Sequence, residues 1–208
     1  MKTFLILTLL MAPLASAATL YSNGVPDLVD GWFSDTDAGK VQLDTLSLSS
    51  PGTVRSVQWW GGYCCAGGQS ADTFTIQFYS DVAGVPGAVF QTYAVAPTLV
   101  DTGNTVAGFE VFQYTADVPD TLLSAGNYWI SIFNDTTADP ANNWFWATSA
   151  QTGTSYEIDG GGAPILNGVS LAFNLADTSS PSVPEPSTLL LSGLGLAAVA
   201  GLRRRHSA

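Results

Sequence analysis

The sequence predicts an all-β domain, an antiparallel β-sandwich of the jelly-roll kind, over residues 18–177. Short runs of alternating apolar and polar residues recur along this span, and Gly, Pro, Asn and Asp separate them. No stretch of the span repeats apolar residues at helical spacing over the length of a helix. The chain has 208 residues, which is enough for one such domain with a targeting segment at each end.

The clearest predicted strand is 73–80. Phe74, Ile76 and Phe78 alternate with polar residues, so one face of this strand is apolar and the other is polar. The glycines and the proline of 81–87 (DVAGVPG) then favour a turn. The other expected strands are 41–48, 53–60, 89–95, 109–115, 128–133, 143–148, 155–158 and 170–175.

The strand 41–48 has one irregular feature. Its apolar residues change parity between Leu43 and Leu46. Because successive side chains of a strand point to opposite faces, this change predicts a bulge or a break.

The N-terminus has the three parts of a secretory signal peptide, residues 1–17. Lys2 supplies a positive start, an apolar run follows (FLILTLL), and Ala-Ser-Ala forms a small-residue cleavage box. We expect signal peptidase to cut after Ala17, so that the mature chain begins at Ala18 after export by the Sec machinery. The apolar run is too short to be a membrane anchor, the alternative reading.

The C-terminus carries a second targeting segment. Residues 178–186 (TSSPSVPEP) form a Ser/Pro linker, and 189–202 form an apolar run that we expect to be a membrane helix. Such a helix is about 21 Å long, which is short for a bilayer without help from its flanks. Arg203, Arg204 and Arg205 follow directly and favour the cytoplasmic side, which leaves the body of the chain outside.

This C-terminal order closely resembles the PEP-CTERM sorting signal. Pro184, Glu185 and Pro186 come first, then the apolar run, then the arginine cluster, so the resemblance covers 183–206. It implies a Gram-negative bacterium and processing by an exosortase, with cleavage near the Pro-Glu-Pro motif. It also implies a transient inner-membrane anchor, followed by delivery to the cell surface or the exopolysaccharide matrix. The alternative is an ordinary tail anchor.

The charge of the body excludes one class of function. Residues 18–182 contain sixteen acidic residues, and their only basic residues are Lys40 and Arg55. Since nucleic-acid affinity comes from basic side chains that displace counterions, the chain is not expected to bind DNA or RNA. The only histidine, His206, lies beyond the body, so imidazole chemistry is not expected there either.

Tryptophans are the first candidates for a binding site. Trp59 and Trp60 are neighbours on a predicted strand, so we expect Trp59 in the core and Trp60 outside or under a loop. Trp144 and Trp146 share one face of another strand, with Phe145 on the other. Exposed indoles at Trp60, Trp144 and Trp146 would suit sugar rings, and the alternative is that these side chains fill the sandwich.

Acidic residues suggest a structural calcium ion and no other cofactor. Asp35 and Asp37 stand in a D-x-D-x-G pattern, which places two carboxylates in one loop. The pattern lacks the rest of a calcium-binding loop, so a solvated acidic surface is the alternative.

Cys64 and Cys65 are adjacent in a Gly-rich loop, and export places them in an oxidising compartment. A trans peptide holds neighbouring Cα atoms closer together than most disulfides prefer. A vicinal disulfide, pairing with another chain, and two free thiols remain open.

No catalytic residue is expected. Glu110 and Glu157 are the only glutamates of the body, and nothing in the sequence brings them together as a glycosidase requires. We therefore expect a non-enzymatic surface or exopolysaccharide-matrix protein. The alternative is a carbohydrate-binding module, and a polysaccharide-acting hydrolase is the remote one.

Overall fold

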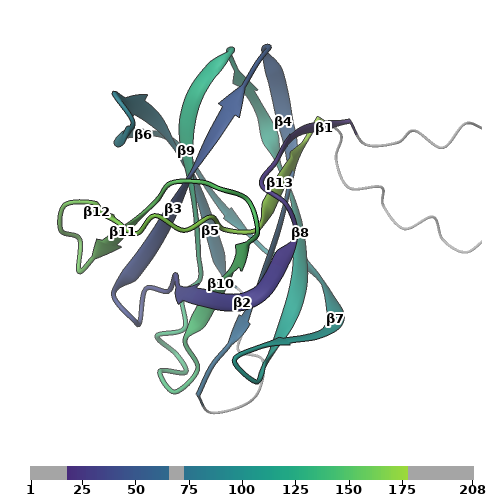
Figure 1. The fold of residues 1–208 in the computed structure, drawn as a ribbon, viewed down its shortest axis with the longest axis vertical. Coiled ribbons are helices and arrows are strands. Elements are labelled where there is room, and N and C mark those ends of the chain that lie inside the picture. The colour runs from purple at the N-terminus through teal and green to yellow at the C-terminus, as the bar shows by residue number, and fades with distance from the viewer. Residues whose placement is uncertain (1–17, 66–72, 178–208) are drawn as a thin grey trace, which may run out of the picture.

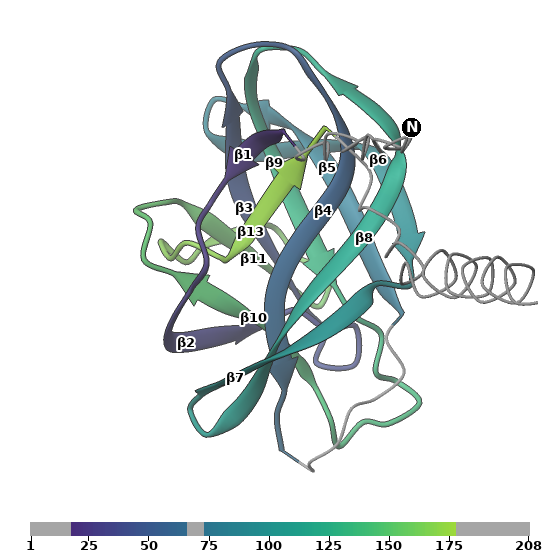
Figure 2. The ribbon, with the colours of Figure 1, turned by 90° about the vertical axis from the view of Figure 1, so that its right-hand side faces the viewer.

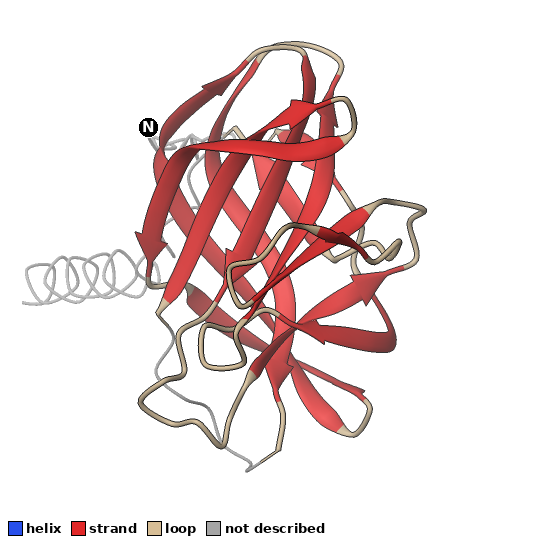
Figure 3. Cartoon of the chain, turned by 90° about the vertical axis from the view of Figure 1, so that its left-hand side faces the viewer, coloured by secondary structure: helices blue, strands red, loops and turns tan. Residues whose placement is uncertain are grey.

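The computed structural model describes residues 18–65 and 73–177, which form two antiparallel β-sheets (Figure 1, Figure 3). All regular structure in these two segments is strand, so the predicted all-β sandwich is confirmed. Jelly-roll connectivity stays a prediction. The signal peptide (1–17), the linker (178–186) and the apolar run (189–202) lie outside the described residues. Within the described part, no helix could cross a membrane.

One sheet has six strands in the order β12-β11-β3-β9-β5-β6. The hairpin β5–β6 confirms the turn and the antiparallel return that the sequence predicts. The bounds are β3 (Lys40–Leu48), β5 (Phe74–Val82), β6 (Val85–Val95), β9 (Gly126–Phe133), β11 (Ser155–Asp159) and β12 (Ile165–Leu166).

The other sheet has seven strands and is organised around β4. The longest strand pairing in this sheet joins β4 to β8. One edge of β4 pairs with β8, and the opposite edge pairs first with β13 and then with β10. The remaining strands extend these pairs: β1 next to β13, β2 next to β10, and β7 next to β8. The bounds are β1 (Thr19–Ser22), β2 (Pro26–Phe33), β4 (Gly52–Tyr63), β7 (Thr98–Val106), β8 (Phe109–Leu123), β10 (Trp144–Ser149) and β13 (Phe173–Ala176).

The described chain begins and ends at the same place. Strands β1 and β13 are antiparallel neighbours, and the Asp177 amide donates a hydrogen bond to the Ala18 carbonyl at 3.0 Å. The Arg55 guanidinium on β4 binds the Asp177 carboxylate at 2.5 Å. Figure 1 shows β1 and β13 next to each other at one end of the sandwich. Whatever follows residue 177 is therefore attached next to the start of the domain.

Aromatic rings fill the core between the sheets. Trp59 of β4 stacks on Tyr114 of β8 with ring centroids 5.6 Å apart, and the Phe74 ring meets both. All three side chains are fully buried. The expectation that Trp59 lies in the core is confirmed, and such rings contribute large buried areas to stability.

A second, smaller core lies on the far side of the seven-stranded sheet. Strands β2 and β7 lie together at this end of the sheet (Figure 2). The Phe145 ring packs there against Gly31 of β2 and clusters with Val106 of β7. Glycines make room for it: a Cβ at Gly31 would lie 2.3 Å from the Phe145 ring, and one at Gly62 would lie 2.0 Å from the Glu110 carbonyl oxygen. Trp60 belongs to this core and is only 5% exposed. The expectation that Trp60 lies outside or under a loop is wrong, because side chains from β7, β8 and β10 cover this face of β4.

The predicted bulge in β3 is also wrong. Strand β3 pairs with β9 in a continuous register from Leu43 to Leu48. Leu43 lies in a separate apolar cluster with Tyr79 and Trp129, whereas Leu46 lies in the core between the sheets. The parity changes because β3 buries apolar side chains on both faces, which a strand with one solvent-facing side does not do.

Candidate functional site

The tryptophans expected to bind sugar are buried. Trp60 is 5% exposed, and Trp144 and Trp146 are completely inaccessible. Trp144 and Trp146 share the core between the sheets, while Phe145 lies in the smaller core, as the alternation predicts. The Trp146 indole N–H donates to the Ala172 carbonyl at 2.9 Å. None of these rings presents an open face to a ligand.

Asp35 has a structural role in this fold. Its side chain is inaccessible, and its Oδ1 accepts hydrogen bonds from the Asp37 amide at 2.9 Å and the Thr136 hydroxyl at 2.8 Å. Its Oδ2 accepts from the Trp144 amide at 2.9 Å. The carboxylate thus ties the turn before β3 to the loop before β10. Among the described residues, no group of three or more His, Cys, Asp or Glu side chains could hold a metal ion, so the expected calcium site at Asp35 and Asp37 gains no support.

Glu110 and Glu157 lie on strands of different sheets. Glu110 is exposed on β8. Glu157 on β11 is mostly buried and accepts hydrogen bonds from the Lys40 ammonium at 2.5 Å and the Gln42 amide at 2.7 Å. The bond to Glu157 raises the pKa of Lys40.

Cys64 and Cys65 form a disulfide with each other directly after β4. Cys64 is buried, and its amide donates to the Asn143 carbonyl at 3.0 Å. Cys65 is exposed and has a φ of 86°, a conformation that non-glycine residues rarely adopt. Of the three arrangements that the sequence left open, the structure contains the vicinal disulfide.

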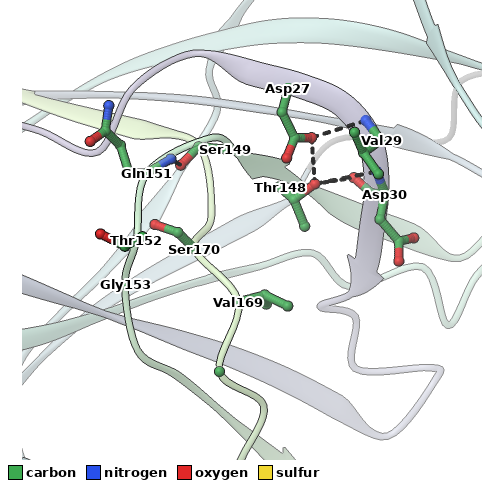
Figure 4. Close-up of a pocket in the computed structure, with 11 residues that line it drawn as sticks. Asp27, Val29, Asp30, Thr148, Ser149, Gln151, Thr152, Gly153, Val169 and Ser170 are labelled. Carbon is green, nitrogen blue, oxygen red and sulfur yellow. Dashed lines mark hydrogen bonds between the residues drawn. The ribbon is translucent and has the colours of Figure 1, made fainter.

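A cleft of about 440 Å³ opens beside β2 (Figure 4). A bulge in β2 makes it: Gly31 pairs with Ala147 of β10, but the next paired residue, Ser149, lies opposite Pro26. Residues 27–30 fall within this register shift, and Leu28 among them has a φ of 63°. Bulges and such conformations cluster at functional sites. We call this hollow the β2 cleft; its lining is Asp27, Val29, Asp30, Thr148, Ser149, Gln151, Thr152, Gly153, Gly168, Val169 and Ser170.

Hydrogen bonds from Thr148 hold the wall of the β2 cleft. The Thr148 hydroxyl lies 2.7 Å from Asp27 Oδ1 and 2.9 Å from the Asp30 carbonyl oxygen. The Val29 amide also donates to Asp27 Oδ1 at 2.9 Å. Figure 4 shows these bonds bridging the bulge to β10. Asp27 Oδ2 has no hydrogen-bond partner within 18–65 and 73–177.

The floor of the cleft rests on a buried polar network. The Ser170 hydroxyl accepts a hydrogen bond from the Asn23 side-chain amide at 2.8 Å. The same amide donates to Asp44 Oδ2 at 2.8 Å, and the Leu171 amide donates to that oxygen at 2.5 Å. Gly153 passes so close that a Cβ there would lie 2.7 Å from the Ser170 hydroxyl.

Burial perturbs the acid beneath this floor. Asp44 is inaccessible to solvent, and burial raises its pKa to about 7, although hydrogen bonds from Leu171, Thr45 and Asn23 oppose the shift. Tyr21 lies nearby, and burial together with the charge of Asp44 raises its pKa to about 12. The Asp44 carboxyl therefore binds or releases its proton close to neutral pH.

Sequence reasoning did not find the β2 cleft. The segment 24–33 (GVPDLVDGWF) lacks the regular alternation of a strand, and no strand is predicted there. The one available signal is Asp27 and Asp30 flanking Leu28 and Val29, since exposed apolar residues between acids are unusual in a strand that faces solvent.

The fold and the C-terminal segment together define an exported β-sandwich domain followed by a sorting segment. Residues 182–205 match the family model of the PEP-CTERM protein-sorting motif. The chain thus carries the motif that its sequence resembles, and the motif implies an exported protein that is anchored in the membrane, processed by an exosortase and sorted to the surface. Comparison with curated proteins finds no match.

Proposed function

We propose that this protein is a non-enzymatic surface or exopolysaccharide-matrix protein of a Gram-negative bacterium. Its β-sandwich domain is the exported part. The signal peptide directs it through the Sec machinery, and an exosortase releases it from the inner membrane near Pro184-Glu185-Pro186. The observation that carries the proposal is the sorting motif at 182–205.

Two features of the domain support a role without catalysis. Residues 18–177 contain no histidine, so a nucleophile activated by imidazole cannot be built within them. The two glutamates of this span lie on different sheets, which does not fit the paired carboxylates of a glycosidase.

The position of the chain ends supports display from a tether. Since β1 and β13 pair with each other, the two targeting segments are attached to neighbouring points of the sandwich. Cutting both segments removes no strand and leaves the Asp177–Ala18 hydrogen bond in place. The processed chain keeps every strand described above.

Intact mass of the chain in a producing strain tests the proposal. We expect surface or matrix material to begin at Ala18 and to lack the arginine cluster. A strain without exosortase should retain the chain in its membrane fraction, as should a variant with alanine at Pro184, Glu185 and Pro186. Alanine at Ser179 and Ser180, just before the matched motif, is the control and should not change sorting. An uncut chain ending at Ala208 outside the cell would contradict the proposal.

A further inference from the structure

We propose that the β2 cleft binds an uncharged saccharide unit of the surrounding polysaccharide. That the ligand comes from the surrounding matrix rests on the function proposed above. The rest of the inference depends on the cleft alone. It places sugar recognition away from the buried tryptophans. Its basis is the shape, the charge and the hydrogen-bonding groups of the cleft.

The cleft has the size and surface of a site for a small polar ligand. Its volume of about 440 Å³ lies in the range of small-molecule sites. Val29 and Val169 give it apolar surface, while Gln151, Thr152 and Ser170 give it polar groups (Figure 4). A sugar ring presents the same combination, since its C–H faces are apolar and its rim carries hydroxyls.

The charge of the cleft selects against anionic ligands. Asp27 and Asp30 are its charged residues, and the basic residues of 18–177, Lys40 and Arg55, do not line it. Arg55 is bound to Asp120 and Asp177, and Lys40 to Glu157. A uronate or phosphate would meet two carboxylates and no cation, so a neutral hydroxyl-rich ligand is the better partner.

The polar groups of the cleft are oriented before a ligand arrives. Asp27 Oδ1 accepts hydrogen bonds from Val29 and Thr148, which leaves Oδ2 of this lining residue as an acceptor for a ligand hydroxyl. The Ser170 oxygen accepts from Asn23, so its own O–H proton is left to donate. Groups that are held in place lose little entropy on binding, which favours affinity.

Gln151 and Thr152 are the residues to test. Both side chains are exposed at the rim of the cleft, so truncation should spare the fold. Gln91 and Thr92 of β6 offer the same pair of side chains, also exposed and outside the cleft, and serve as the matched control. Thr152→Trp supplies a second variant that fills the cleft instead of emptying it.

The experiment titrates the exported chain, purified in mild detergent, with neutral trisaccharides of glucose, mannose, galactose or N-acetylglucosamine. Trigalacturonate is the anionic probe, and calorimetry or ligand-observed NMR gives the Kd. We expect saturable binding of a neutral trisaccharide with a Kd on the order of 1 mM. Gln151→Ala/Thr152→Ala and Thr152→Trp should each weaken it at least tenfold, Gln91→Ala/Thr92→Ala should not, and trigalacturonate should bind at least tenfold more weakly.

Three results would overturn the inference: no binding of any neutral trisaccharide, equal binding of trigalacturonate, or full binding in both cleft variants. Sorting is measured separately by intact mass. A correctly sorted chain without sugar affinity would refute the cleft proposal alone. A chain that binds sugar but leaves the cell uncut would refute the proposed function alone.

Discussion

Asp44 makes the stability of the domain depend on pH. Burial raises the pKa of this carboxyl from 3.8 to about 7 in the folded protein. A raised folded pKa means that the folded state binds a proton more tightly than the unfolded state does. The contribution of Asp44 to stability is therefore fully present below pH 4 and is lost as the pH rises through 7.

The size of this effect follows from the shift. One pKa unit corresponds to about 1.36 kcal/mol, so a shift of roughly three units amounts to about 4 kcal/mol across the window. The donors around Asp44 reduce the cost of the charged form without removing it. Within this window the free energy of unfolding should fall by at most about 1.4 kcal/mol per pH unit.

Urea unfolding from about pH 5 to pH 8, followed by tryptophan fluorescence, measures this slope. Asp44→Asn cannot ionise, so we expect the difference in unfolding free energy between wild type and variant to change by roughly 3 kcal/mol, most of it between pH 5 and pH 7. The other carboxylates are common to both proteins and cancel in the difference. Asp101→Asn, at an exposed position, controls for the loss of one negative charge. Parallel curves for wild type and Asp44→Asn would refute the reasoning.

Three further predictions concern packing and hydrogen bonds, and denaturant titration checks each. Gly62→Ala should destabilise the domain by more than about 3 kcal/mol, because its Cβ would overlap the Glu110 carbonyl. An unfolding midpoint equal to that of the wild type would contradict the close packing at Gly62. Asp35→Ala should lower the free energy of unfolding by at least about 3 kcal/mol, since it leaves several buried donors without an acceptor. Asp37→Ala should lower it by under about 0.5 kcal/mol, and equal losses in the two variants would contradict the structural role of Asp35. Thr148→Val should cost about 1 kcal/mol and weaken sugar binding about tenfold by releasing the β2 bulge, and unchanged affinity would argue against a fixed wall.

Local alternation predicts the interior strands of this fold well. Phe74, Ile76 and Phe78 face the core as their spacing indicates, and the hairpin that follows has the expected turn. The pattern works there because one face of β5 is apolar and the other is polar. Strands β1, β2, β7 and β12 are not predicted, because they are short, bulged or largely exposed and carry little alternation.

Reasoning about faces fails where the sheet is covered on both sides. Trp60 follows Trp59 and must point to the opposite face of β4. That face is buried because β2 and β7 pack together beside Phe145, a tertiary contact that the spacing of residues in β4 cannot predict. The β2 cleft depends on a bulge and on side chains that are far apart in sequence, Asp27 and Thr148. The sorting motif, in contrast, is linear, so the sequence suffices to identify it.

The scarcity of basic residues has a consequence for survival outside the cell. Proteases that cut after lysine or arginine have only Lys40 and Arg55 to attack between residues 18 and 177. Lys40 is paired with Asp159 of β11, and Arg55 lies within β4 at the register shift between Val54 and Ser56. Both side chains are held by carboxylates. A protease needs an extended, unpaired segment in its own active site, so cleavage at either position requires the domain to open first. Tryptic digestion of the folded domain should therefore be slow, and its rate should report how often β3 or β4 opens.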